Sequence, residues 1–180
     1  MAIYEKRSIL AAPARDVFAW HRRPEALRAL VPPWERVVVE QIPATLGDGE
    51  RAVLRMAVGP FTVRWVAEHV GFVDRGDEGG EFTDVQVAGP FRAWRHRHRV
   101  AADGPGACTL EDRVEYELPF GWLGRLVGGR LARRRLERMF AYRHEATRAA
   151  VTADAGEAAG AGDEPAPGVV ARGLDRGRER

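Results

Sequence analysis

The sequence contains little cysteine and no long apolar run. Cys108 is the single cysteine among 180 residues, so an internal disulfide and a metal site built from several cysteines are both excluded. A membrane-spanning helix needs roughly eighteen consecutive apolar residues, and no such run occurs. The first ten residues contain no apolar core of a secretory signal and are typical of a strand. We therefore expect a cytoplasmic protein with no membrane span.

Signature motifs of common enzymes are also missing. The chain has no glycine-rich phosphate loop, no Ser-His-Asp order and no paired carboxylate motif. Lys6 is the only lysine, and one stretch is rich in arginine: Arg130, Arg133, Arg134, Arg135 and Arg138. Such a run is usually a solvated helix face, and the alternatives are an anionic membrane, nucleic acid or a regulatory partner. We expect no specific nucleic-acid binding.

What is present is a series of short alternating segments followed by one long helix. The pattern predicts strands at 3–10, 34–42, 51–58, 61–73, 81–88, 91–101 and 107–118, and helices from Pro13 to His21, at 24–30 and at 120–151. Short connections rich in glycine and proline separate the last six strands, which indicates an antiparallel meander. The fold class is therefore α+β, with a seven-stranded antiparallel curved sheet in the order β-α-α-β6-α around the C-terminal helix.

The long helix carries an apolar stripe in its second half. Gly128 and Gly129 separate this half from the first, and a glycine pair predicts a kink or a break there. Arg143 lies in the middle of the apolar stripe. Either its stem packs while its head reaches solvent, or it points into a cavity and meets a carboxylate or a ligand.

The C-terminal segment 153–180 contains no aromatic residue and consists mainly of Ala, Gly, Asp, Glu, Pro and Arg. Such a composition cannot bury enough apolar surface to offset the entropy of ordering it. We therefore expect a ligand-binding domain at 1–152 and a disordered tail at 153–180.

Histidine and aspartate alternate with apolar residues on two predicted neighbouring strands. Strand alternation places Asp112 on the inward face of its strand, together with Cys108, Leu110, Val114, Tyr116 and Leu118. Trp94, His96, His98 and Val100 share a face of the preceding strand. A turn around Asp103-Gly104 pairs His96 with Asp112, and a shift of two residues brings in His98 instead.

Three interpretations of this pair remain open. The histidine satisfies a buried aspartate, which is the preferred one. Alternatively, the pair orients a ligand or performs acid–base chemistry, or two histidines and Asp112 bind a metal. We expect neither a metal nor a cofactor.

Trp65 lies on the same face of its predicted strand as Phe61, Val63, Ala67 and His69. The two-residue Gly59-Pro60 turn makes Leu54 and Met56 cross-strand neighbours of these residues on the same side of the sheet. Such an arrangement is more typical of core than of a pocket. Asp84 is a possible pocket residue, but the alternation around it leaves its direction open.

Three stretches carry a family resemblance: AAPARDVFAWHRRPEALRALVPPW, GPFRAWRHRHR and MFAYRH. They resemble the START-like or SRPBCC superfamily over about residues 2–150, a group that includes Bet v 1-like, polyketide cyclase/dehydratase-like and coenzyme Q-binding proteins. The resemblance implies a helix-grip fold with an apolar cavity that binds a small molecule or lipid between the sheet and the long helix.

Within that fold, we expect the ligand to contact Trp65, Trp94, His96, His98, Asp112, Tyr116, Met139, Phe140 and Arg143. The alternative is a cyclase/dehydratase-type enzyme, in which His96 or His98 acts as the general base and Asp112 orients it. A second alternative is a regulatory module that acts through the arginine-rich helix. The sequence does not identify the ligand or the oligomeric state.

Overall fold

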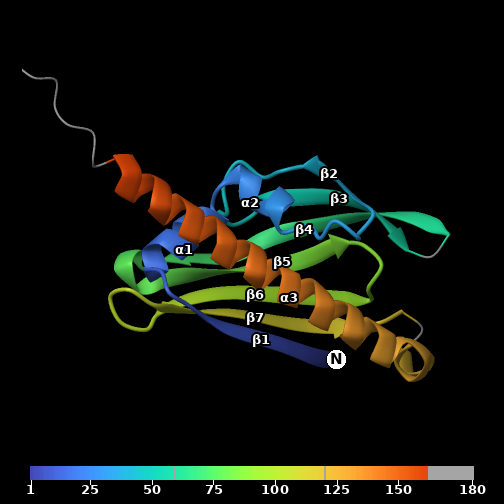
Figure 1. Cartoon of the computed structure of the whole chain (residues 1–180). Coiled ribbons are helices and arrows are strands. Elements are labelled where there is room, and N and C mark those ends of the chain that lie inside the picture. The colour runs from blue at the N-terminus through green and yellow to red at the C-terminus, as the bar shows by residue number, and fades with distance from the viewer. Residues whose placement is uncertain (59, 120, 162–180) are drawn as a thin grey trace, which may run out of the picture.

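Seven strands form one antiparallel sheet, and a long helix lies across one face of it (Figure 1). The computed structural model describes residues 1–58, 60–119 and 121–161. In chain order the elements are β1 (Ala2–Leu10), α1 (Ala14–His21), α2 (Pro24–Ala29), β2 (Val37–Gln41), β3 (Arg51–Val58), β4 (Phe61–Asp74), the 3-10 turn η1 (Gly76–Glu78), β5 (Gly79–Ala88), β6 (Ala93–Ala102), β7 (Cys108–Glu117) and α3 (Gly121–Ala161).

The strand order confirms the predicted meander. The sheet runs β1-β7-β6-β5-β4-β3-β2, so β2 to β7 are sequential neighbours and β1 pairs with β7 at one edge. The predicted α+β helix-grip fold is confirmed, since α3 covers the sheet that the seven strands form.

Helix α1 begins where the proline pattern predicts. Pro13 occupies the cap position and α1 follows directly, since proline suits the start of a helix. The helix packs closely on β5, where a Cβ at Gly80 would lie 2.4 Å from the Phe18 ring. Gly79 adopts a φ of 93° at the same place. These two glycines allow α1 to approach the sheet and bring His21 toward the interior.

Helix α3 differs from the prediction in two ways. It continues through Gly128 and Gly129, so of the predicted kink or break the break does not occur, while the kink stays a prediction. It also continues past Val151 to Ala161, the last described residue, and an ion pair of 2.7 Å joins Asp154 to Arg23. The predicted tail therefore begins too early, because alanine and glutamate extend a helix that packing has already nucleated. The remainder of that tail, 162–180, lies outside the described residues.

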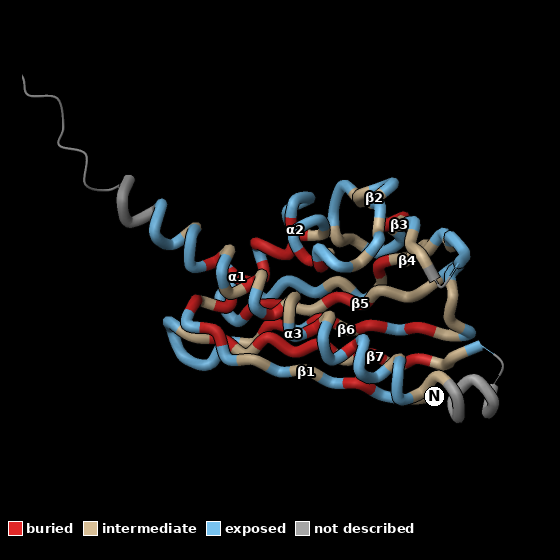
Figure 2. The backbone as a smooth tube through the Cα atoms, turned by 45° about the vertical axis from the view of Figure 1, so that its right-hand side comes forward, coloured by how far each residue is buried: buried red, intermediate tan, exposed pale blue. Residues whose placement is uncertain are grey.

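Buried residues are frequent along β6 and β7, the strands that α3 crosses (Figure 2). The predicted inward face of β7 is confirmed, since Asp112 and its four alternating neighbours are all buried: Cys108, Leu110, Val114 and Tyr116. Toward one end of α3 the core is built around Phe140 and Trp94. Toward the other it is built around Phe18 and Trp20 of α1.

Candidate functional site

All five histidines of the chain are buried. They come from α1, β4, β6 and α3, and none is more than 9% exposed: His21, His69, His96, His98 and His144. Imidazoles are polar and are normally only partly buried, so such a concentration needs internal partners. Two inward carboxylates, Asp84 on β5 and Asp112 on β7, supply most of them.

The register of β6 and β7 differs from the preferred prediction by two residues. His98, and not His96, lies opposite Asp112. The turn spans Asp103 to Ala107, and the Asp103 N–H donates to the Ala107 carbonyl at 2.8 Å. This turn is longer than the one predicted around Asp103-Gly104. The alternative register, shifted by two residues so that His98 pairs with Asp112, is therefore the correct one.

Asp112 accepts hydrogen bonds from three imidazoles. Its Oδ1 lies 2.7 Å from His96 Nε2 and 2.9 Å from His98 Nδ1, and its Oδ2 lies 2.8 Å from His144 Nε2. Burial alone would raise the pKa of the Asp112 carboxyl, but the charge of His98 and the three N–H donors hold that pKa well below its usual range. Asp112 is therefore an ionised carboxylate with its acceptor positions filled.

His98 bridges the two carboxylates. Its Nδ1 contacts Asp112, and its Nε2 lies 3.0 Å from Asp84 Oδ2. Ionised carboxylates only accept, so both ring nitrogens must carry protons. Burial opposes that charge, but Asp112 and Asp84 together raise the pKa of His98 to about 9. The ring is therefore an imidazolium at neutral pH.

Asp84 points into this cluster, which the sequence left open. It lies directly opposite His69 on β4 and His96 on β6. Its Oδ1 is 3.1 Å from His69 Nε2. Burial raises the pKa of the Asp84 carboxyl, but the contacts with His69 and His98 outweigh burial and hold that pKa below its usual range. Asp84 is therefore ionised, and it lines the cavity.

His96 keeps one ring nitrogen uncommitted. Its Nε2–H donates to Asp112, while its Nδ1 lies 4.0 Å from Asp84 Oδ2 and makes no hydrogen bond with any described residue. Burial, followed by the charge of His98, lowers the pKa of His96 to about 4. His96 is therefore neutral at physiological pH, with a lone pair on the cavity wall.

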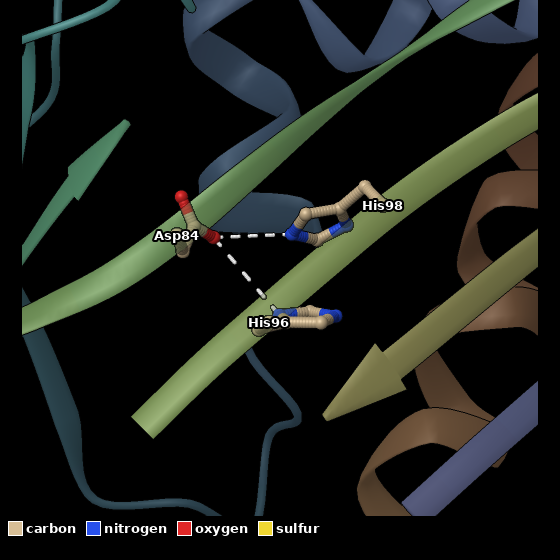
Figure 3. Close-up of side chains that lie close together, drawn as sticks. All are labelled: Asp84, His96 and His98. Carbon is tan, nitrogen blue, oxygen red and sulfur yellow. Dashed lines mark hydrogen bonds and ion pairs between the residues drawn. The ribbon is translucent and has the colours of Figure 1, made fainter. Parts of the chain in front are cut away.

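Asp84, His96 and His98 also bring together one metal-ligating atom each, all within 4.8 Å (Figure 3). Two imidazoles and a carboxylate suit Zn²⁺ or a similar divalent ion. Here both nitrogens of His98 are bonded to carboxylates, so an ion must first displace a proton from that ring. Asp112, the third ligand considered from the sequence, contacts only the far side of both rings. The expectation of no metal stays a prediction.

His144 is the residue that sequence reasoning missed. It joins Asp112 to β1, because its Nδ1 lies 2.8 Å from Ser8 Oγ. A signal was present, since His144 follows the buried Phe140 by four residues and so falls on the same helix face.

Two adjoining chambers open between the sheet and α3. The smaller has a volume of about 100 Å³ and a mostly apolar lining, but it also contains His69, Asp84, His96 and His98, and we call it the polar chamber for these four residues. An apolar chamber of about 310 Å³ lies beside it. Five side chains border both: Leu54, Trp65, Trp94, Met139 and Arg143. These five form the junction of the chambers.

The structure separates the predicted ligand contacts into two groups. Trp65, Trp94, Met139 and Arg143 lie at the junction, and His96 and His98 line the polar chamber. By contrast, Tyr116 and Phe140 pack in the core with Tyr4 and do not line either chamber. Asp112 lies behind the two histidines, next to His144.

Arg143 is half-buried and borders the cavity. Its Nε–H donates to the Leu30 carbonyl at 3.2 Å, and its guanidinium carbon lies 5.4 Å from the centre of the Phe140 ring. Burial lowers its pKa. The cavity-facing interpretation is the one that this position supports.

Residues 10–140 match the family described as "Polyketide cyclase / dehydrase and lipid transport". The chain belongs to this family. The resemblance to the SRPBCC and START-like superfamily is thereby confirmed. No curated protein matches the chain.

Several solved structures have a fold similar to that of this chain. Norcoclaurine synthase from Thalictrum flavum is 15% identical, with a TM-score of 0.65 over 85% of this chain and 95% of that one. A START superfamily protein from Mycobacterium smegmatis is 13% identical, with a TM-score of 0.58 over 83% and 97%. A nucleoside-diphosphate sugar epimerase from Corynebacterium glutamicum is 27% identical, with a TM-score of 0.59 over 81% of this chain but 28% of its own. The first two likenesses show the fold alone.

Proposed function

We propose that this family member binds a hydrophobic, lipid-like small molecule between the sheet and α3. The observation that carries the proposal is the apolar chamber, whose volume of about 310 Å³ lies at the lower end of the usual range for small-molecule sites. Its charged lining residues are Glu35, Arg135 and Arg143, and the first two pair with each other. An apolar molecule therefore meets few unpaired polar groups there. Among the described residues, no helix is long and apolar enough to cross a bilayer.

The test is uptake of a naphthalene or fatty-acid fluorescent probe. Wild type should bind with micromolar affinity, and Met139→Trp should weaken binding at least tenfold, because the indole fills the junction. Ala141→Trp is the matched control, since Ala141 is exposed on the same helix and the added volume faces solvent. The proposal fails if wild type takes up no probe, or if both variants weaken binding equally. Native mass spectrometry of protein from its own host would then identify the physiological ligand.

A second candidate is an enzyme of the cyclase or dehydratase type. The observation in its favour is that Asp112 orients His96 while the Nδ1 of His96 faces the polar chamber. However, a pKa of about 4 makes His96 a weak base at neutral pH, and His98 keeps its proton to about pH 9. These values favour binding over proton abstraction. Turnover of a polyketide-like substrate that His96→Gln abolishes, with probe affinity retained, would reverse this ranking.

The arginine-rich face of α3 gives less support to a regulatory role. Arg133 pairs with Glu137, Arg135 pairs with Glu35, and Arg138 stacks on Trp34 at 4.2 Å. Part of this charge is therefore used within the protein. We continue to expect no specific nucleic-acid binding.

A further inference from the structure

Arg143 is a cation that forms no ion pair with any residue that the structure describes. A guanidinium has five N–H donors, and the hydrogen bond to Leu30 uses one of them. Within the described part of the chain, no carboxylate oxygen lies within 4.0 Å of its nitrogens, whereas Arg97 and Arg135 each pair with a glutamate. Because Arg143 borders both chambers, its remaining donors are available at the junction.

The neighbouring carboxylates are not its missing partners. Asp112 already accepts from three imidazoles, and Asp84 contacts two. His98 supplies a positive charge between them. Both aspartates therefore lie within ion-pair distance of imidazoles, although the buried Asp84 Oδ1 makes no hydrogen bond with a described residue. Arg143 has no charged partner at such a distance among the described residues.

Trp65 also borders both chambers, but its indole N–H is not exposed in them. The Nε1 atom is fully buried and has no hydrogen-bond partner among residues 1–58, 60–119 and 121–161. An indole N–H only donates, and a donor that is closed off from the chambers does not reach a ligand in them. Arg143 is therefore the donor that a ligand meets at the junction.

We propose that the ligand carries a carboxylate or similar anionic oxygen group that Arg143 binds at the junction, with the apolar body of the ligand in the larger chamber. This inference rests on the small-molecule binding proposed above and narrows it to an amphipathic acid. Guanidinium and carboxylate have matching planar geometry and form the stronger class of hydrogen bond. The polar chamber beyond the junction offers the Nδ1 lone pair of His96, which suits a hydroxyl on the same head group.

The experiment compares 2-naphthoic acid with 2-naphthamide, which have the same ring system and differ in head-group charge. Calorimetric titration of the full-length protein at pH 7.5 should show at least tenfold tighter binding of the acid. Arg143→Gln should remove this preference while changing amide affinity by less than threefold. Arg134→Gln is the control on the exposed face of α3 and should keep the wild-type preference. The preference should persist at about 0.5 M salt, since buried pairs are screened less than surface charges.

Circular dichroism checks that each variant is folded, and Arg143→Lys provides a second test. Lysine keeps the charge but not the forked donors, so an intermediate preference is expected. Equal affinity of wild type for acid and amide would overturn the inference and leave the binding function intact. A preference that survives in both Arg143 variants would also overturn it. Binding of neither compound would count against the proposed function, and the inference would fall with it.

Discussion

Asp112 shows how a buried charge is tolerated in this protein. The side chain is 4% exposed, and an isolated carboxylate there would be strongly unfavourable. Three imidazole donors from β6 and α3 replace the lost water, and His98 shares its positive charge with Asp84. The same contacts connect the centre of the sheet to the helix that covers it. A structural role for this cluster is therefore compatible with a ligand site on its cavity side.

Replacing Asp112 tests that structural role. Asp112→Asn keeps the shape but removes the counter-charge of His98, and it turns an amide N–H₂ toward imidazole donors. We expect it to destabilise the fold by about 2–4 kcal/mol, measured by urea denaturation. Glu115→Gln is the control, because Glu115 lies on the outward face of the same strand and should cost less than about 1 kcal/mol. If Asp112→Asn loses ligand affinity at unchanged stability, Asp112 serves the site instead of the fold.

Helix α3 is the element that joins fold and cavity. Its inward face supplies Met139 and Arg143 to the junction and His144 to the Asp112 cluster. Gly128 lines the apolar chamber, next to Gly129, yet the helix is continuous there. The glycine pair therefore weakens the helix locally without interrupting it.

Gly129→Ala tests the cost of that weakness. A Cβ at Gly129 meets nothing within 4 Å, so alanine fits without displacement. Its better helix propensity should stabilise the protein by about 0.5–1 kcal/mol in urea or thermal unfolding. Gly156→Ala in the exposed C-terminal part of α3 should stabilise it less, because that end can fray. A loss of stability in Gly129→Ala would instead indicate a bend that only glycine permits.

At the scale of the whole molecule, the buried histidines link stability to pH in opposite directions. The pKa of His98 rises from 6.5 to about 9 on folding, so its contribution is complete below pH 6.5 and is lost as pH rises through 9. The pKa values of His21 and His96 fall to about 4, mainly through burial. Their contributions are complete above pH 6.5 and are lost as pH falls toward 4.

We therefore expect the free energy of unfolding to be greatest near pH 6.5 and to decline on both sides, measured by urea denaturation between pH 5 and 9. In His98→Gln the decline above pH 7 should disappear, while the decline below pH 6 should remain. A wild-type stability that keeps rising from pH 7 to 9 would contradict a protonated His98 bridge.

Much of the architecture was determined by local sequence. Alternation placed Asp112 on the inward face of β7, and the predicted position of Leu54 opposite Trp65 is confirmed. Such short-range features are decided within one strand or one tight turn, so tertiary contacts cannot easily change them. The element order and the loose motifs then sufficed for the family.

Only the tertiary structure decided the composition of the site. The turn between β6 and β7 contains Gly104 and Gly106 and permits more than one length, so packing selected His98 as the partner opposite Asp112. Register shifts between β4 and β5 hid the direction of Asp84 from simple alternation. His69 and His144 lie on elements far apart in the chain, and no local rule pairs such residues. His69 contacts Asp84 and His144 contacts Asp112. They do so because closure of the sheet under α3 removes water, and a buried carboxylate then needs donors within the protein.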